Sequence, residues 1–141
     1  MTPHSRAGYT VMVVDDDPAV LATYRRLLRR AGYTTVTESD PSRVLSDHAA
    51  ARPDLLLLDY KMPGMDGLSL LAELRQRACR ARCILISAFL NDDVRNRATH
   101  LGVDRVFEKP VDARALRQVI HNLLPPTGTP GAGSDPDQVG A

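Results

Sequence analysis

Carboxylates follow two apolar segments of the chain, at the point where each segment ends. Asp15 and Asp16 come directly after residues 10–14, and Asp59 comes directly after four consecutive leucines. Short apolar runs of this kind are typical of strands that are buried on both faces of a parallel sheet. The carboxyl ends of such strands share one edge of the sheet, which is where open α/β sheets bind ligands. Three adjacent carboxylates repel one another unless a cation lies between them, and oxygen ligands suit Mg²⁺.

Two later strands are expected to end in polar side chains at the same edge. Ser87 closes the apolar run 83–87, and Lys109 follows the run 103–107. A hydroxyl and a compact ammonium group can bind phosphoryl oxygens, and an aspartate can act as a covalent nucleophile. Each residue alone could be a helix cap, a surface charge or an ion-pair partner. Together they predict a phosphoryl acceptor at Asp59, because a chance meeting of all of them at one edge is a poor explanation.

Strand and helix patterns alternate five times along the chain. The expected strands are residues 10–14, 33–38, 54–59, 83–87 and 103–107. Apolar residues at helical spacing follow each strand, with starts at Asp17-Pro18, Asp40-Pro41 and Asp112 and a stop at Gly32. This alternation predicts a (βα)5 doubly wound α/β fold with helices on both faces of a parallel sheet. The flavodoxin-like strand order 2-1-3-4-5 suits a sheet of five strands.

Length and composition favour one small domain and exclude several kinds of site. The 141 residues fit a domain at 9–124, with a disordered leader at 1–8 and a disordered Pro/Gly-rich tail at 125–141. A net charge of +1 gives no reason to expect nucleic acid or a membrane as partner, and the arginines are interpreted as solvated helix faces. The chain has no signal-like or membrane-spanning run, so a cytoplasmic location is expected. Cys79, Cys83 and four scattered histidines predict neither a disulfide nor a structural zinc site.

The ordered combination of these motifs resembles the receiver domain of two-component response regulators. The resemblance covers residues 9–124 and rests on Val13-Val14-Asp15-Asp16-Asp17-Pro18, Leu58-Asp59, Met62-Pro63-Gly64-Met65-Asp66-Gly67, Ile86-Ser87-Ala88 and Glu108-Lys109-Pro110. It implies that Asp59 accepts a phosphoryl group from a phosphohistidine on a sensor histidine kinase or histidine phosphotransfer protein. It further implies that Ser87 and Lys109 bind the phosphoryl oxygens.

The resemblance also implies a magnesium site built from the acidic cluster. Asp16, Asp59 and the backbone carbonyl of Lys61 would hold Mg²⁺ directly, and Asp15 would assist through water. The Lys109-Pro110 pair fits a turn that fixes the lysine, and its peptide bond is a candidate for the cis form.

One departure from the family pattern concerns the switch. Family members usually carry an aromatic residue three positions before the lysine, whereas this chain has Val106 there and Phe107 next to it. The side chain of Val106 is too small and too stiff to swing as an aromatic one does. We therefore expect the response to phosphorylation to be concentrated in residues 87–93. Phe89 in that loop is expected to cover the phosphoryl site and to slow attack by water.

Two alternatives to a receiver that signals through protein contacts are considered. A small aspartyl-phosphate phosphotransfer enzyme or phosphatase of the haloacid dehalogenase type places a second acid two residues after the nucleophile, but this chain has Lys61 there. A DNA-binding regulator would need a helix-turn-helix, and no such unit is visible. The expected protein is thus not an enzyme for a separate substrate, does not bind nucleic acid directly, and is a monomer or a phosphorylation-dependent dimer.

Overall fold

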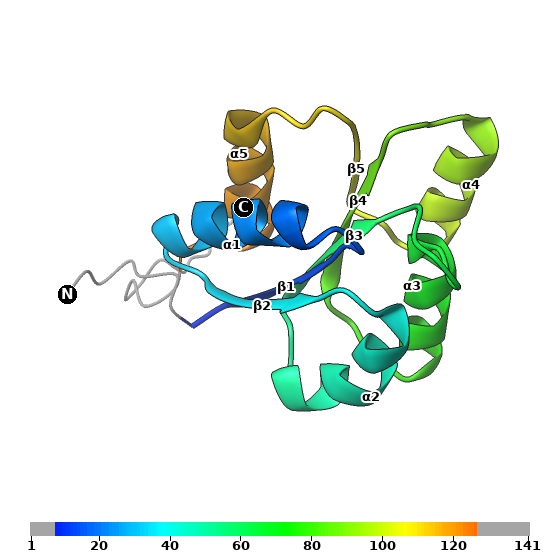
Figure 1. The fold of residues 1–141 in the computed structure, drawn as a ribbon, viewed down its shortest axis with the longest axis horizontal. Coiled ribbons are helices and arrows are strands. Elements are labelled where there is room, and N and C mark those ends of the chain that lie inside the picture. The colour runs from blue at the N-terminus through cyan, green and yellow to red at the C-terminus, as the bar shows by residue number, and fades with distance from the viewer. Residues whose placement is uncertain (1–7, 127–141) are drawn as a thin grey trace, which may run out of the picture.

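The computed structural model describes residues 8–126, in which five strands and five helices alternate (Figure 1). The strands are β1 (Thr10–Val14), β2 (Thr34–Glu38), β3 (Leu55–Asp59), β4 (Arg82–Ser87) and β5 (Arg105–Glu108). The helices are α1 (Pro18–Arg30), α2 (Pro41–Ala51), α3 (Gly67–Gln76), α4 (Asp92–His100) and α5 (Ala113–Leu123). The expected leader and tail fall almost entirely outside the described residues.

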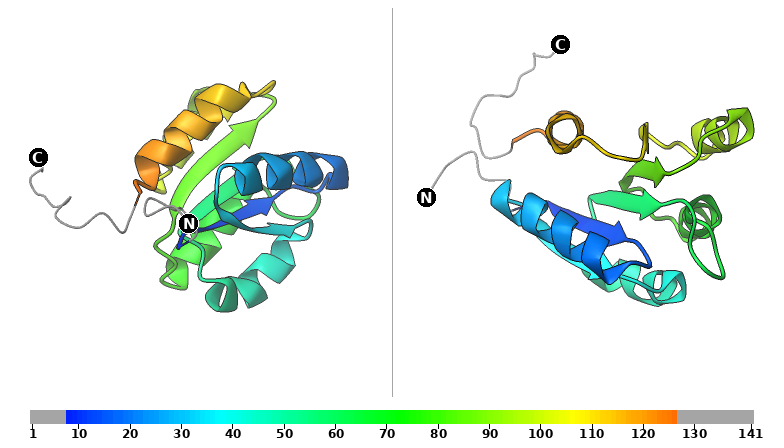
Figure 2. Two further views of the ribbon diagram at one scale, coloured as in Figure 1. Left: turned by 90° about the vertical axis from the view of Figure 1, so that its left-hand side faces the viewer. Right: turned by 45° about the horizontal axis from the view of Figure 1, so that its top comes forward.

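All strands are parallel and lie in the order β2-β1-β3-β4-β5, which confirms the predicted topology. Helices α1 and α5 cover one face of the sheet, and α2, α3 and α4 cover the other (Figures 1 and 2). Side chains of β1, β3 and β4 alternate between two apolar clusters, one on each face. The four leucines of β3 are therefore at most 1% exposed, and each contributes about 1.5 to 3 kcal/mol by burial.

Five strand boundaries differ from the sequence prediction by one or two residues. At the starts of β3 and β5, an aspartate bonds across the strand start instead of extending the strand. The Asp54 carboxylate accepts a hydrogen bond from the Thr10 N–H at 2.8 Å, and β3 begins one residue later. The Asp104 carboxylate accepts one from the Cys83 N–H at 2.9 Å. Residues 103 and 104 therefore lie between the turn after α4 and the strand, and β5 begins two residues later than predicted. Strand β4 begins at residue 82, one residue earlier than predicted. Strand β2 begins at residue 34, one residue later than predicted, and β5 ends at residue 108, one residue later.

The helix ends follow the expected capping pattern. The carboxylates of Asp17, Asp40 and Asp112 each accept a hydrogen bond from a backbone N–H in the first turn of the helix that follows. Gly32 ends the first helical segment with φ of +96°, a conformation that glycine adopts without strain. None of the helices within residues 8–126 is long and apolar enough to span a membrane.

Both cysteines are free thiols in this structure. Cys83 lies in the core on β4, and burial raises the pKa of its thiol to about 12. Cys83 therefore stays protonated and packs as a small apolar residue.

Candidate functional site

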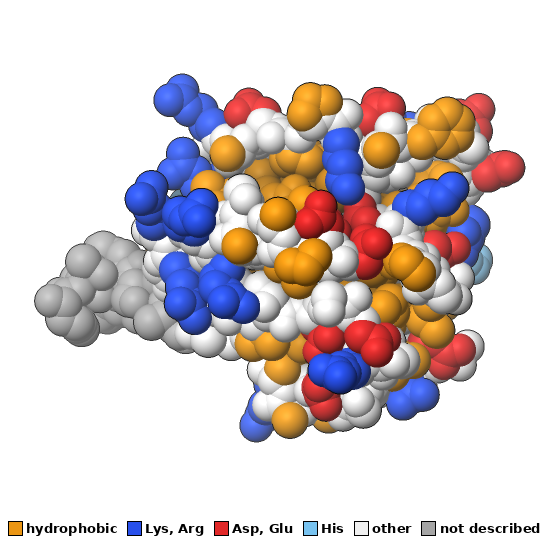
Figure 3. All heavy atoms as spheres, viewed as in Figure 1, with side chains coloured by type: hydrophobic (Ala, Val, Ile, Leu, Met, Phe, Trp, Pro, Cys, Tyr) orange, Lys and Arg blue, Asp and Glu red, His pale blue; other side chains and the backbone are white. Residues whose placement is uncertain are grey.

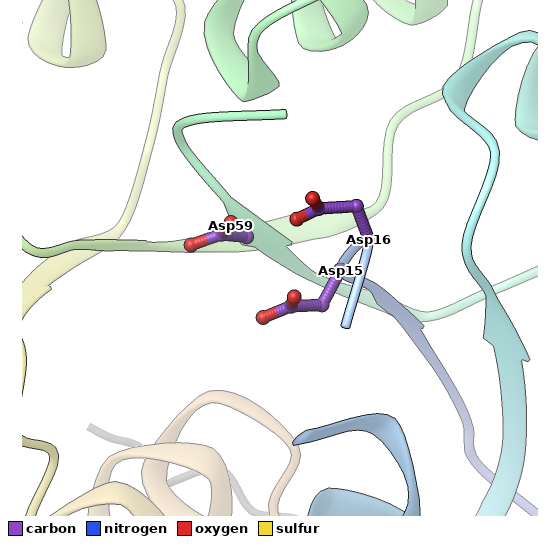
Figure 4. Close-up of side chains that lie close together, drawn as sticks. All are labelled: Asp15, Asp16 and Asp59. Atoms are coloured by element: carbon purple, nitrogen blue, oxygen red, sulfur yellow. The ribbon is translucent and has the colours of Figure 1, made fainter. Parts of the chain in front are cut away.

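Three carboxylates meet at the carboxyl edge of the sheet, as the sequence predicts. Strands β1 and β3 are neighbours, with Val14 opposite Leu58, so the residues that follow them come together. Oxygen atoms of Asp15, Asp16 and Asp59 all lie within 4.8 Å of one another, and the three side chains project in the same direction (Figure 4). Asp15 and Asp59 are only 3% and 6% exposed, whereas Asp16 faces solvent. The cluster can therefore hold a cation that approaches from the solvent side.

Burial dominates the electrostatics of the two inner carboxylates. Burial raises the pKa of Asp15, the hydrogen bond from the Asp17 N–H opposes this shift, and the charge of Asp59 adds to it. Burial likewise raises the pKa of Asp59, although the hydrogen bond and positive charge of Lys109 act in the opposite direction. Ionising both groups in this place costs free energy that a bound cation would return.

Lys109 supplies the positive charge of the site. Its Nζ lies 2.9 Å from Oδ1 of Asp59. Burial lowers the pKa of Lys109, but the hydrogen bond to Asp59 and the charges of Asp59 and Asp15 outweigh burial, so the pKa is raised. The Lys109-Pro110 peptide bond is cis, as predicted, and the Lys109 N–H donates to the Ser87 carbonyl at 2.9 Å. The backbone after β5 is thus bonded to the end of β4, which directs the ammonium group toward Asp59.

Ser87 lies at the predicted edge, but its hydroxyl bonds within its own loop. The Oγ donates to the Phe89 carbonyl at 2.6 Å and accepts from the Phe89 N–H at 3.1 Å. The Ser87 side chain is 2% exposed, while the Phe89 ring is 68% exposed. The ring is thus largely open to solvent in this structure, and the expectation that Phe89 covers the phosphoryl group, which concerns the phosphorylated protein, stays a prediction.

Val106, at the position where family members usually carry an aromatic residue, lies on one face of the sheet, and the neighbouring Phe107 lies on the other. Val106 packs against the cluster formed with α3 and α4, whereas Phe107 packs against the cluster formed with α1 and α5. This follows from the alternation of side chains along a strand. The guanidinium of Arg105 lies 5.7 Å from the centre of the Phe107 ring. Phe107 is thus held on the opposite side of the sheet from α4 and cannot take the role of the missing aromatic residue.

Gly67 has a role at the site that sequence reasoning missed. Its N–H donates to the Tyr60 carbonyl at 2.7 Å, so α3 starts directly against the end of β3. A Cβ atom on Gly67 would lie 2.4 Å from the Asp59 carbonyl oxygen, which is too close for any other residue without a shift. The sequence predicts only a turn here, because a close approach between backbones leaves no pattern in a single chain.

A second feature without a sequence signal joins α4 to the loop after Asp59. Arg97 on α4 lies 3.7 Å from the Asp66 carboxylate and 3.4 Å from the Tyr60 hydroxyl. Asp66 also caps α3 by accepting a hydrogen bond from the Ser69 N–H at 2.7 Å. The exposed Arg97 side chain contributes at most about 1 kcal/mol through such a pair, so it orients α4 rather than fixing it.

Comparison with known proteins agrees with this geometry. The sequence model of the response regulator receiver domain matches residues 11–121. Sporulation initiation phosphotransferase F of Bacillus subtilis (strain 168) is 30% identical over 115 residues, which cover 82% of this chain and 93% of that protein. The DNA-binding transcriptional regulator NtrC of Salmonella typhimurium is 38% identical over 102 residues, which cover 72% of this chain but only 22% of that longer protein.

A solved structure that contains a metal is also similar. It is the response regulator protein TrrA from Thermotoga maritima in complex with Mg(2+)-BeF, with a TM-score of 0.72 and 27% sequence identity. The match covers 82% of this chain and 99% of that one. The chain described here belongs to the receiver domain family of two-component response regulators.

Proposed function

We propose that Asp59 accepts a phosphoryl group from a phosphohistidine on a sensor histidine kinase or a histidine phosphotransfer protein. A carboxylate oxygen of Asp59 forms the new bond to phosphorus, the bond from phosphorus to the histidine nitrogen breaks, and the histidine keeps that electron pair and takes up a proton. The observation that carries the proposal is the set of charged groups around the Asp59 carboxylate. Its buried carboxylate lies beside two further carboxylates and 2.9 Å from the ammonium group of Lys109.

We further propose that the acidic cluster binds Mg²⁺. Asp16 and Asp59 would supply carboxylate oxygens, Lys61 a backbone carbonyl, and Asp15 a contact through water. The donor set fits this ion, because Mg²⁺ prefers oxygen ligands and retains several waters, and Asp16 and Lys61 are exposed to solvent. When bound, Mg²⁺ would neutralise charge shared by the carboxylates and the incoming phosphoryl oxygens. The similarity to a receiver crystallised with Mg(2+)-BeF supports the assignment.

Lys109 and Ser87 would bind the phosphoryl oxygens once the group is on Asp59. Lys109 is already at the acceptor, so only its partner changes, from a carboxylate oxygen to a phosphoryl oxygen. Ser87 must first give up its two hydrogen bonds with Phe89. We therefore propose that the loop 87–93 moves inward on phosphorylation and brings Phe89 toward the phosphoryl group.

The output is proposed to be a change in protein contacts, made by a receiver unit at residues 9–124 as a monomer or a phosphorylation-dependent dimer. Turnover of a separate substrate is not part of the proposal. A small phosphatase acting through an aspartyl phosphate would need an acid two residues after Asp59, and Lys61 occupies that position.

The acceptor is tested with acetyl phosphate and Mg²⁺ on the full chain, and intact mass spectrometry measures the gain of one phosphoryl group. Asp59→Asn should abolish the gain. Asp54→Asn is a matched control, because Asp54 directly precedes β3, at the end of the strand away from Asp59, and accepts a hydrogen bond from the Thr10 N–H. Labelling of Asp59→Asn to the same extent as the parent would remove Asp59 from the proposal.

The switch is tested by amide NMR shifts with and without beryllofluoride, which mimics an aspartyl phosphate. We expect the largest shifts in residues 87–93. Shifts of equal or greater size at Val106 and Phe107 would contradict the proposed loop movement.

A further inference from the structure

Four arginines lie close together in the segment that joins α3 to β4. This segment reads Arg75-Gln76-Arg77-Ala78-Cys79-Arg80-Ala81-Arg82 and contains no acid. It ends where β4 begins, at the edge of the sheet opposite the acceptor, and β4 spans six residues, or about 20 Å. In Figure 3 a group of acidic side chains lies at the carboxyl ends of β1 and β3. The acceptor edge is therefore acidic, and the opposite edge carries a separate group of cations.

A hollow with a volume of about 530 Å³ lies beside this segment. Its lining includes Arg75, Arg80 and Arg82, together with Gly102 and Asp104 from the segment between α4 and β5. This cavity, called here the arginine hollow, thus lies at the amino ends of β4 and β5. Its volume falls within the range of about 300 to 1,000 Å³ that small-molecule sites occupy.

Backbone carbonyls hold the guanidinium of Arg75 in place. Its Nη1 donates to the Cys79 carbonyl at 3.0 Å and to the Ala81 carbonyl at 2.8 Å, and its Nε donates to the Leu101 carbonyl at 3.3 Å. Nη2 carries two further N–H donors, which have no acceptor in the described part of the chain. A Cβ atom on Gly102 would lie 4.0 Å from Nη2, so these free donors lie beside the lining of the arginine hollow. They are fixed before any ligand arrives.

The other two cations of the arginine hollow also have spare donors. Arg82 uses only Nη1 in its 3.2 Å ion pair with Asp104, and its side chain is 58% exposed. Arg80 is exposed and forms no hydrogen bond or ion pair within the described residues. Three guanidinium groups and one carboxylate leave two positive charges. The C-terminal ends of α3 and α4 offset them by about half a charge each, so the arginine hollow stays positive.

We infer that the arginine hollow binds a diphosphate group, either free or as part of a nucleotide. A guanidinium presents parallel N–H donors that match the oxygens of a phosphate. A diphosphate has two phosphorus centres, so it can bind the fixed Nη2 of Arg75 and the side chains of Arg80 and Arg82 together. A single phosphate or carboxylate meets fewer of these donors. This ligand site lies away from Asp59 and does not depend on the proposed function.

The form of the arginine hollow favours a small anion over a nucleic acid. A nucleic-acid backbone needs cations along its whole path, whereas these donors surround a single cavity. None of the residues that line the cavity is aromatic, so it offers no ring on which a base can stack. The diphosphate group, rather than a base, should therefore determine the affinity.

Binding is measured by amide NMR titration of the full chain, labelled with ¹⁵N, in EDTA and at constant ionic strength. The probes are inorganic pyrophosphate, ADP, AMP and an oligothymidine. We expect pyrophosphate and ADP to shift amides of residues 75–82 and 101–104 and to bind at least about 10-fold more tightly than AMP. Equal affinity for pyrophosphate and ADP would identify the diphosphate as the whole ligand, and tighter binding of ADP would identify a nucleotide.

Three results of the titration would overturn the inference. They are affinity for AMP equal to that for pyrophosphate, tighter binding of the oligothymidine, and shifts centred on Asp59 and Lys109. The variant Asp59→Asn should bind pyrophosphate as the parent does, because the two sites lie at opposite edges of the sheet. Weaker binding by this variant would place the anion at the acceptor and would contradict a separate site.

Neutral substitutions locate the contact on the molecule. The double variant Arg80→Gln/Arg82→Gln should weaken pyrophosphate binding at least about 10-fold, because two guanidinium groups are lost. The double variant Arg26→Gln/Arg29→Gln makes the same change in net charge on α1, with both side chains exposed, and should alter the affinity by less than about twofold. Equal losses in the two variants would mean that net charge alone attracts the anion, and the inference would be wrong.

A single substitution guards against an effect of misfolding. Arg80→Gln removes an exposed side chain that has no bonded partner among the described residues, so the fold should be retained. We expect this variant to bind pyrophosphate at least about threefold more weakly than the parent. Urea denaturation of the same samples should give the parent midpoint. An unchanged affinity would remove Arg80 from the site and would overturn the inference.

Discussion

Replacing Asp15 with asparagine should stabilise the protein when no divalent cation is present. Asp15 is 3% exposed, and its neighbours Asp16 and Asp59 have carboxylate oxygens within 4.8 Å. Asparagine has nearly the same shape, and its Oδ1 can still accept the 2.9 Å hydrogen bond from the Asp17 N–H. The substitution therefore removes a buried charge without removing the contact that orients the side chain.

The size of the stability gain follows from the repulsion between carboxylates that Lys109 does not compensate. Lys109 lies against Asp59 and compensates mainly that carboxylate. For one remaining pair of charges at 4.8 Å, the largest separation of the carboxylate oxygens, an effective dielectric constant of about 20 gives about 3.5 kcal/mol. Solvent screens the exposed Asp16, so we expect the free energy of unfolding to rise by about 1 to 3 kcal/mol at neutral pH.

The sign of the pH dependence follows from the raised pKa of Asp15. Burial raises this pKa above its ordinary value of 3.8, so the folded protein holds the proton to a higher pH than the unfolded chain does. The stability that the protonated Asp15 contributes is fully present below the ordinary pKa. It is lost as the pH rises through the raised pKa of the folded protein. The gain from Asp15→Asn should therefore be large at neutral pH and should shrink as the pH falls toward the ordinary value.

Urea denaturation in EDTA, at neutral and at acidic pH, measures both effects. The same experiment in Mg²⁺ is the control: the parent protein should gain stability, and Asp15→Asn should gain less, because one carboxylate of the proposed site is lost. A variant that is less stable than the parent in EDTA at neutral pH would refute the reasoning. So would a gain that is independent of pH.

Three further substitutions test the packing and the loop of the site. Gly67→Ala places a methyl group 2.4 Å from the Asp59 carbonyl oxygen, so we expect a loss of about 1 to 3 kcal/mol in urea denaturation. Parent-like stability would show that α3 can shift without cost. Ser87→Ala should slow labelling by acetyl phosphate, and an unchanged rate would remove Ser87 from phosphoryl binding. Phe89→Ala should speed loss of the phosphoryl group, followed by mass spectrometry, because the inward loop would no longer shield it from water; an unchanged half-life would contradict that shielding.

The architecture and the acidic cluster could be predicted because each rests on a periodic or local signal. Apolar runs mark the strands, Asp-Pro pairs mark helix starts, and parallel strands bring Asp15 and Asp59 to one edge. The same logic predicts that Lys109 reaches that edge, and the structure places it 2.9 Å from Asp59. The roles of these residues in phosphoryl transfer remain predictions.

Contacts between residues far apart in the chain could not be predicted in the same way. The Asp104 carboxylate bonds to the Cys83 backbone, which moves the start of β5 by two residues, and nothing near position 104 signals this. The hydroxyl of Ser87 forms two hydrogen bonds with the Phe89 backbone in its own loop, because both backbone groups lie within reach without any change of conformation. The concentration of six arginines on α1 and α5, neither of which contains an acid, could not be read from the net charge of +1, because that total sums over faces that the fold separates.

The sheet separates helices α1 and α5 from helices α2, α3 and α4. This separation affects how a signal could pass through the molecule. A partner on α1 and α5 would leave α4 uncovered, because α4 covers the other face of the sheet (Figures 1 and 2). A phosphodonor and a second protein bound to these two faces could then occupy one chain together. In that complex the phosphoryl group would be delivered and sensed without an intervening dissociation step. Transmission would not depend on how long the aspartyl phosphate survives in the free protein.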